Sequence, residues 1–209
     1  MPYASDTRLL VLHGLRLKGF GEPDAIGAIV GLDADDVAKH LETLLAEELA
    51  LRRDGPRLAG WGPTAAGRAE QERLLAAELD AAGCRDVVAA SYDPFLELNK
   101  PLLEICTAWQ MKDETTLNDH TDAAYDSAVI DRVVKHHSEL EPILERLESA
   151  LHRYARYRPR FELALDNLGE GVHDWFTKPM IDSYHTVWFQ LHEDLLNTLG
   201  IDRSSEGST

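Results

Sequence analysis

The chain has 209 residues, a length that can bury one large hydrophobic core or two modest ones. Hydrophobic residues make up 44% and charged residues 28% of the composition, which is ordinary for a globular domain and excludes a wholly disordered chain. The net charge of −16 is uneven, because residues 1–75 contribute −3 and residues 76–209 contribute −13. A negative field opposes phosphate, so any contact with nucleic acid must come from the first part.

Cysteine usage and hydropathy bear on the compartment. The two cysteines, Cys84 and Cys106, stand in segments with helical patterning, so we expect reduced thiols and no disulfide framework. The first ten residues lack a basic region followed by an apolar stretch, and no apolar run approaches the ~18 residues that span a bilayer. We therefore expect a cytoplasmic protein with no membrane partner.

Three helices are predicted in the first 50 residues. Residues 6–18 are leucine-rich, and a short second helix should begin at Pro23 and close at Gly31. Asp33 is expected to cap a third helix, and Asp36 can complete a capping box with it. The apolar stripe of this third helix comprises Val37, Leu41, Leu44, Leu45 and Leu49.

A hairpin and a fourth helix should follow. The runs "LALRR" and "RLAGW" flank the turn signal "DGP", which predicts two short strands, and Thr64 can cap a long helix that runs toward Gly83. The order helix, helix, helix, hairpin, helix predicts a winged helix-turn-helix domain over residues 1–82, with a small two-stranded wing.

The stretches "GLDADDVAKHLETLLAEELALRR" and "GWGPTAAGRAE" resemble the recognition helix, wing and post-wing helix of bacterial MarR-like winged-helix transcription regulators. The resemblance covers roughly residues 6–80, and it departs from the family pattern at Pro63, where those proteins carry a leucine. The full chain is also similar to uncharacterised actinobacterial regulators. The resemblance implies a transcription regulator that binds double-stranded DNA as a homodimer and is not an enzyme.

The predicted DNA contacts lie on the third helix and around the hairpin turn. The start of a recognition helix normally meets the bases, and here it is acidic, so affinity should depend on the arginines of the hairpin. The predicted DNA-binding residues are Arg52, Arg53, Arg57, Lys39, Ala34 and Asp35, with help from Arg16 and Lys18. The alternative is a docking module that binds no DNA and whose acidic third helix meets a basic partner protein.

Residues 83–202 are predicted to form an α-helical bundle for dimerisation or ligand sensing, followed by a disordered tail over residues 203–209. Pro94 and Pro101 should begin or bend helices, and the long helix that follows the polar stretch "DETTLNDHTD" should bend near Pro142. Asp122 can cap this long helix. The chain as a whole is thus expected to be mainly α.

The last helical segment is "KPMIDSYHTVWFQLHEDLLNTLG", with Pro179 in its first turn and Gly200 at its end. Its apolar seam is Ile181, Tyr184, Trp188, Leu191 and Leu195. The seam can pack inside the chain or against a second copy. In a two-fold dimer it would place two winged helices on successive half-sites of DNA.

Aromatic and histidine residues gather in the second half. They suit either a bundle core or a pocket for a small aromatic or amphipathic effector. The predicted ligand-binding residues are Trp109, Asn118, His173, Trp175, Tyr184, His185 and Trp188.

A third hypothesis is a metal-binding bundle or an enzyme. Asp182, His185 and His192 lie on one face of the expected helix, because steps of three and seven residues return to the same side. His173 and Asp174, or His136 and His137, could join them as ligands. A di-iron bundle needs paired Glu-x-x-His motifs, however, and this segment offers one Asp-x-x-His. The chain also lacks a phosphate loop, H-E-x-x-H, C-x-x-C and G-x-S-x-G, so we predict no cofactor, no metal and no catalytic residues.

Overall fold

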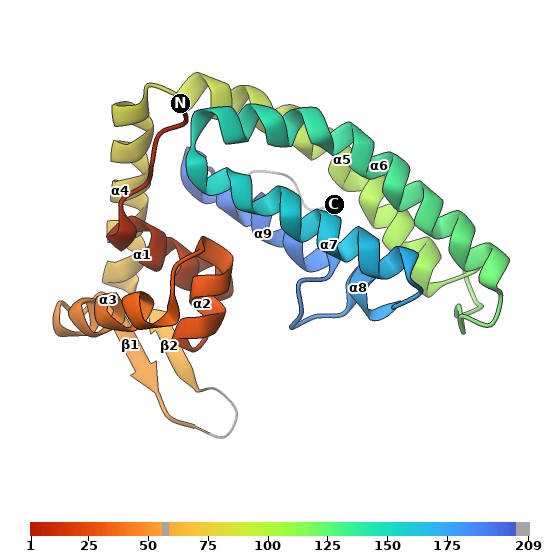
Figure 1. Cartoon of the computed structure of the whole chain (residues 1–209), viewed down its shortest axis with the longest axis horizontal. Helices are drawn as coiled ribbons and strands as arrows, with labels where there is room; N and C mark the ends of the chain where they lie inside the picture. Colours follow the sequence, from red (N-terminus) through yellow and green to blue (C-terminus); the bar gives the residue numbers. More distant parts are fainter. Residues whose placement is uncertain (56–58, 204–209) are drawn as a thin grey trace.

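The computed structural model describes residues 1–55 and 59–203, and this part of the chain is mainly α-helical with one two-stranded antiparallel sheet (Figure 1). Its elements are α1 (Thr7–Lys18), α2 (Pro23–Val30), α3 (Ala34–Ala46), β1 (Ala50–Arg53), β2 (Gly60–Pro63), α4 (Ala65–Ala82), α5 (Arg85–Gln110), α6 (Ala123–Ala150), the 3₁₀ helix η1 (His152–Arg156), α7 (Tyr157–Gly169), α8 (Asp174–Thr177) and α9 (Tyr184–Leu199). The predicted DNA contact Arg57 and the predicted tail beyond Arg203 lie outside the described residues.

The first three helices and the hairpin enclose a small hydrophobic core. Its buried members are Val11, Leu12, Leu15, Ile26, Val37, Leu41, Leu44, Ala50 and Trp61. The predicted ends of α2 are confirmed, because Pro23 stands at its start and Gly31 closes it in the left-handed conformation, with φ 67°. We call α1 to α3, the hairpin and the first part of α4 the N-terminal unit.

The predicted capping box of α3 is wrong. Asp33 occupies the N-cap position, but its side chain accepts no capping hydrogen bond. The Asp36 carboxylate accepts a hydrogen bond from Lys39 Nζ at 2.8 Å instead of reaching back to the helix start. Leu45, which the periodicity assigned to the apolar stripe, is 39% exposed. The helix therefore depends on the burial of Val37, Leu41 and Leu44 rather than on its cap.

The hairpin forms and is fixed at its base. Its second strand is Gly60–Pro63, which differs from the predicted run over residues 57–61. Arg52 pairs with Trp61 across the two antiparallel strands, and the Trp61 side chain is buried in the small hydrophobic core of the N-terminal unit. Two backbone hydrogen bonds between Trp61 and Gly21, at 2.9 and 3.0 Å, add the segment before α2 to the edge of β2. The strands then project beyond the body of the molecule (Figure 1).

Helix α4 connects this unit to the rest of the chain. Thr64 caps it as predicted, since its hydroxyl oxygen accepts the backbone N–H of Gly67 at 2.9 Å. Gly83 closes it with φ 60°, a conformation that favours glycine. Leu79, near the end of α4, belongs to the second hydrophobic core, so one continuous helix reaches both cores.

The second core lies in a helical bundle in which the antiparallel pair α5 and α6 forms one layer and α7 and α9 the other (Figure 1). We call α5 to α9 the bundle. Among the described residues, no helix combines the length and the apolarity needed to cross a membrane. Cys84 and Cys106 are buried free thiols, and burial raises the pKa of Cys106 to about 12.

The prolines of the bundle do not begin helices. Helix α5 runs through Pro94 and Pro101, and α6 runs through Pro142. Pro94 has no N–H for the carbonyl of Ala90, the residue one turn earlier. The guanidinium of Arg146 on α6 donates to that carbonyl at 2.9 Å. A partner from the neighbouring helix thus replaces one of the lost backbone hydrogen bonds, which local sequence could not indicate.

The predicted start of the last helix is wrong. Pro179 lies in a turn, and α9 begins at Tyr184 with the Ser183 hydroxyl as its cap. Four of the five predicted seam residues, Tyr184, Trp188, Leu191 and Leu195, are at most 3% exposed within the single chain. Because these side chains already fill the bundle core, a homodimer would have to use another surface.

A buried polar network joins the two cores. Arg153 of η1 contacts the carboxylates of Glu78 on α4 and Asp194 on α9. Asp194 also lies 3.1 Å from His13 Nε2 of α1 and accepts the Tyr157 hydroxyl at 2.8 Å. Burial alone would raise the pKa of Asp194, but Arg153 and His13 hold it far below its ordinary value. We call these five residues the Arg153 network.

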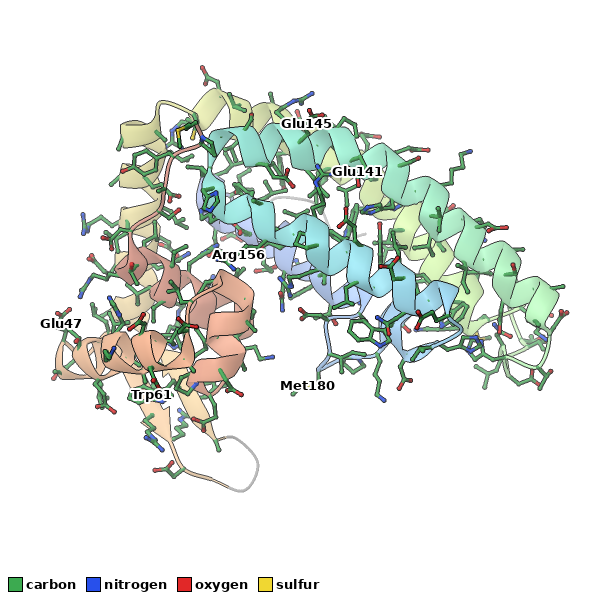
Figure 2. The ribbon with its side chains drawn as sticks, viewed as in Figure 1. Glu47, Trp61, Glu141, Glu145, Arg156 and Met180 are labelled. Atoms are coloured by element: carbon green, nitrogen blue, oxygen red, sulfur yellow. The ribbon has the colours of Figure 1, made fainter. Side chains whose placement is uncertain are left out.

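A second link between the units is a hydrogen bond from η1 to α2. The Arg156 guanidinium donates to the Gly31 carbonyl at 2.9 Å, and Figure 2 places Arg156 between the bundle and α2. The absence of a side chain at Gly31 is required there, because the guanidinium occupies the space that a Cβ would fill.

Candidate nucleic-acid interface and the predicted pocket

The outer face of α3 carries the predicted base-contacting residues. Ala34, Asp35 and Lys39 are exposed, as expected from the stripe of buried residues opposite them. Together with Asp33 and Asp36 they line a shallow depression at the start of the helix. Three carboxylates and one ammonium group therefore meet any ligand that approaches this end of α3.

Lys39 is paired but not sequestered. Its ammonium group lies 2.8 Å from Asp36, and this hydrogen bond raises the pKa of Lys39 and lowers that of Asp36. The side chains are 72% and 54% exposed. Water and salt screen such a pair, so Lys39 can exchange the carboxylate for a phosphate.

The two described arginines of the hairpin are exposed and rest on aromatic rings. The Arg52 guanidinium lies 5.6 Å from the centre of the Trp61 ring and 3.5 Å from an Asp54 oxygen. The Arg53 guanidinium lies 5.5 Å from the centre of the Phe20 ring. Stacking on a ring holds a guanidinium in place and leaves its N–H groups pointing outward.

Of the two additional basic residues of α1, Arg16 does not contribute to this surface. Its Nε donates to Asn197 Oδ1 of α9 at 3.0 Å, so the side chain faces the bundle. Lys18 is half-buried at the end of α1. The spacing on a single helix could not distinguish these two directions, because the bundle that covers Arg16 is folded from the other half of the chain.

The predicted ligand-binding residues separate into two groups. Tyr184 and Trp188 are core residues: the Trp188 ring stacks on Phe95 with centres 4.4 Å apart, and its N–H donates to Asn99 Oδ1 at 3.1 Å. His185 and Trp175 are half-buried, and burial lowers the pKa of His185. These four residues therefore form no common pocket, because the bundle packs its aromatic rings against one another.

Trp109, Asn118 and His173 do come together, at the end of the bundle remote from the N-terminal unit (Figure 1). The Trp109 ring lies 5.1 Å from the His173 ring and 4.5 Å from the ring of His120, which sequence reasoning missed. Asn118 Nδ2 donates to the Trp109 carbonyl at 3.0 Å and to Asp126 Oδ1 at 2.7 Å.

The residues first considered for a metal do not assemble. Asp182 receives two hydrogen bonds from Arg160, at 2.8 and 3.0 Å, and His192 is buried with its ring 5.4 Å from that of Phe95. Within the described ranges, three potential ligands meet at His120, Asp126 and His173. The only local signal for the first two is the polar run "NDHTDAAYD", which has no helical repeat.

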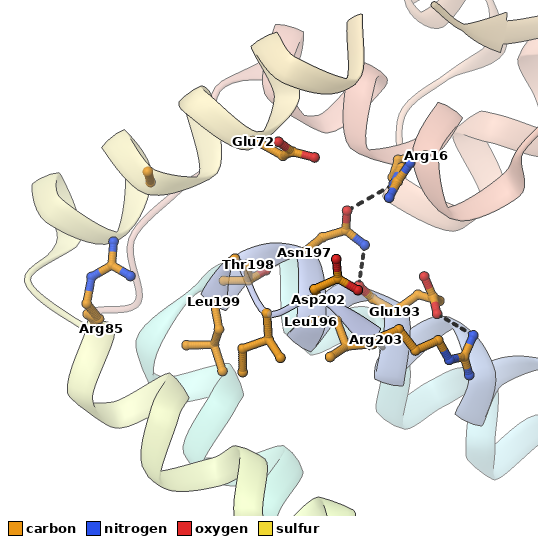
Figure 3. A pocket seen from close by; sticks show the side chains of 13 residues that line it. Arg16, Glu72, Arg85, Glu193, Leu196, Asn197, Thr198, Leu199, Asp202 and Arg203 are labelled. Carbon is orange, nitrogen blue, oxygen red and sulfur yellow. Dashed lines mark hydrogen bonds and ion pairs between the residues drawn. The ribbon is translucent and has the colours of Figure 1, made fainter. Parts of the chain in front are cut away.

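A separate cleft of about 440 Å³ lies between α4 and α9 (Figure 3). The Arg16–Asn197 hydrogen bond closes one side of it, and Arg203 pairs with Glu193 at 2.7 Å along another. Its charged lining residues are Arg16, Arg85, Arg203, Glu72, Glu193 and Asp202. None of the predicted ligand-binding residues lines this cleft.

Comparison of the chain with protein-family models, with curated proteins and with solved structures finds no match.

Proposed function

We propose that residues 1–82 form a winged-helix unit that binds double-stranded DNA and that the protein is a transcription regulator. The observation that carries this proposal is the position of the hairpin. It projects beyond the rest of the molecule next to α3 (Figure 1), and its exposed Arg52 and Arg53 lie over the rings of Trp61 and Phe20. The order of α1, α2, α3, hairpin and α4 is the order of a winged helix.

The charges on this surface favour contacts with the phosphate backbone of DNA. Arg52, Arg53 and Lys39 can each neutralise a phosphate, since the ion pairs of Arg52 and Lys39 are exposed to solvent. Asp35 at the start of α3 repels phosphate, although a carboxylate can accept a hydrogen bond from a cytosine amino group. We therefore expect modest affinity with a strong dependence on salt.

DNA binding should be tested by fluorescence anisotropy with mixed-sequence duplexes at about 50 and 200 mM salt. Binding should weaken steeply between the two concentrations and decrease strongly in Arg52→Ala/Arg53→Ala. The matched control is Arg132→Ala/Lys135→Ala, which removes two exposed positive charges from α6. Equal losses in both double variants, or no binding of the wild type in dilute buffer, would exclude the proposal.

Effector control requires a ligand that binds one arrangement of two DNA-bound units more tightly than another. The cleft in Figure 3 supports this role, because residues of α1, α4 and α9 line it together. Its three arginines and three carboxylates fit a polar, charged effector better than the aromatic one expected from the sequence.

Docking to a basic partner protein is the second candidate. It is supported by the three exposed aspartates at the start of α3, which outnumber the single lysine beside them and make this surface negative. In this case a basic peptide should bind the wild type and bind Asp35→Asn/Asp36→Asn more weakly, while the arginine variants keep full affinity.

A further inference from the structure

We propose that His120, Asp126 and His173 bind a divalent transition-metal ion of the zinc class at the end of the bundle remote from the N-terminal unit. The three residues come from separate segments: the loop before α6, the first turn of α6 and the turn before α8. One potential ligand atom from each lies within 4.8 Å of the other two. The site does not depend on the proposed DNA binding.

The donor set has the right chemistry for such an ion. Two imidazoles and one carboxylate are common ligands of zinc, and of iron when positions stay open for other ligands. The ion pair described for Asp126 is with His120, not with a lysine or an arginine. Its carboxylate is buried, and a cation would add charge compensation to that of an imidazole.

Hydrogen bonds outside the ligand set hold the site. Asn118 Nδ2 donates to Asp126 Oδ1 at 2.7 Å, and Asn118 Oδ1 accepts the backbone N–H of His120 at 3.1 Å. The His120 backbone has φ 58°, a left-handed conformation that is uncommon outside glycine. Such oriented neighbours and strained residues are typical of metal sites and other functional sites.

Trp109 and Phe176 form an apolar wall behind the ligands. The Trp109 ring touches both histidine rings and lies 5.3 Å from the buried Phe176 ring. On the other side, the His120 side chain is 31% exposed and His173 is half-buried. Water can therefore reach the ion and complete its coordination, as in zinc sites with three protein ligands.

The potential ligand atoms are close enough to share one ion. Two ligands at about 2.0–2.1 Å from a zinc ion lie at most about 4.2 Å apart, and the atoms here all lie within 4.8 Å of one another. His120 and His173 lie in connecting segments, where side-chain rotation can adjust their positions. His120 Nδ1 lies 3.1 and 3.0 Å from the two Asp126 oxygens, so an ion bound by this nitrogen would take the place of that hydrogen bond.

The test is equilibrium dialysis of the untagged full chain against Zn²⁺, with the bound metal measured by elemental analysis. The wild type should bind about one zinc ion per chain, and His120→Ala and His173→Ala should each weaken binding at least ~100-fold. His152→Ala, which removes an exposed histidine of η1, is the matched control and should bind like the wild type.

A second measurement separates ligation from misfolding. Asp126→Asn keeps an oxygen that can accept the Asn118 hydrogen bond, so the fold should survive with an unchanged circular dichroism spectrum. The visible absorption bands of bound Co²⁺ should nevertheless disappear. The proposal is overturned if the wild type binds no Zn²⁺, or if a folded His120→Ala/His173→Ala variant binds as much as the wild type.

Discussion

The Arg153 network and the His120–Asp126–His173 cluster both place an aspartate beside a histidine, but their surroundings differ. Asp194 is closed within the protein, next to a guanidinium, an imidazole and a phenol, and the Arg153 and Asp194 side chains are 3% and 4% exposed. Asp126 is buried too, yet its histidine partners reach solvent. Two features therefore distinguish a structural network from a site that can bind a ligand: access of solvent to the side chains, and the presence of a buried guanidinium beside the aspartate.

Removal of the buried guanidinium of Arg153 should have the largest effect on stability. Arg153→Met leaves Glu78 and Asp194 without their main partner, and breaking such a pair costs about 3–5 kcal/mol of the free energy of unfolding. Urea denaturation at neutral pH measures this loss. Arg158→Met is the control, because Arg158 pairs with Glu141 and Glu148 while 27% exposed, and it should lose clearly less. Equal losses would mean that burial does not distinguish the two arginines.

Acid should act on the same network. The pKa of Asp194 is lowered in the folded protein, so the unfolded chain takes up this proton first as the pH falls. The stabilisation from Asp194 is thus complete above about pH 5 and is lost as the pH falls through the ordinary aspartate pKa of about 3.9 and below.

Asp126 should show a weaker form of this acid dependence. Burial raises the pKa of Asp126, but hydrogen bonds from Asn118 and His120 lower it overall. The free energy of unfolding, measured by urea denaturation from neutral to acidic pH, should therefore fall more steeply in the wild type than in Asp194→Asn. The substitution Asp126→Asn should alter this pH dependence less than Asp194→Asn does. If Asp194→Asn leaves the pH dependence of the unfolding free energy unaltered, Asp194 is not the group that causes the loss of stability in acid.

Zinc should stabilise the protein through the His120–Asp126–His173 cluster, without involving the Arg153 network. At a free zinc concentration about 100 times the dissociation constant, linkage adds about 2.7 kcal/mol, which is roughly 5–10 °C in the melting temperature of a chain of this size. The increase should be absent in His120→Ala. Arg153→Met should retain it, because distant sites contribute additively. Loss of the zinc effect in Arg153→Met would show that the two regions are coupled.

The smallest expected effect concerns the residue that supports the cluster. Asn118→Ala removes the hydrogen bonds to Asp126 and to the Trp109 carbonyl but leaves the three ligands in place. Zinc affinity should fall about 10–100-fold, which is less than the loss of a ligand. Dialysis against Zn²⁺ measures it, with Asn167→Ala as control, since the Asn167 amide donates only within α7. A loss as large as that of His173→Ala would make Asn118 a ligand itself.

Several helix ends were predictable, because their determinants are local. Thr64, Asp122 and Ser183 each accept a backbone N–H within three residues, and of these the first two were predicted from the residue type and its position. Gly31 and Gly200 close their helices in a left-handed conformation that few other residues adopt without strain. The prolines do not end their helices, and Arg146 of the neighbouring helix α6 satisfies the carbonyl that Pro94 leaves free.

The sequence determined a mainly helical chain with a small hairpin, because hydrophobic periodicity and caps act over a few residues. Tertiary structure alone decided that the seam of α9 faces inward, that Arg16 faces the bundle and that His120 meets Asp126 and His173. These outcomes depend on segments brought together from separate parts of the chain. Their meeting follows from the burial of large apolar surfaces, which leaves no local pattern around the polar residues that it positions.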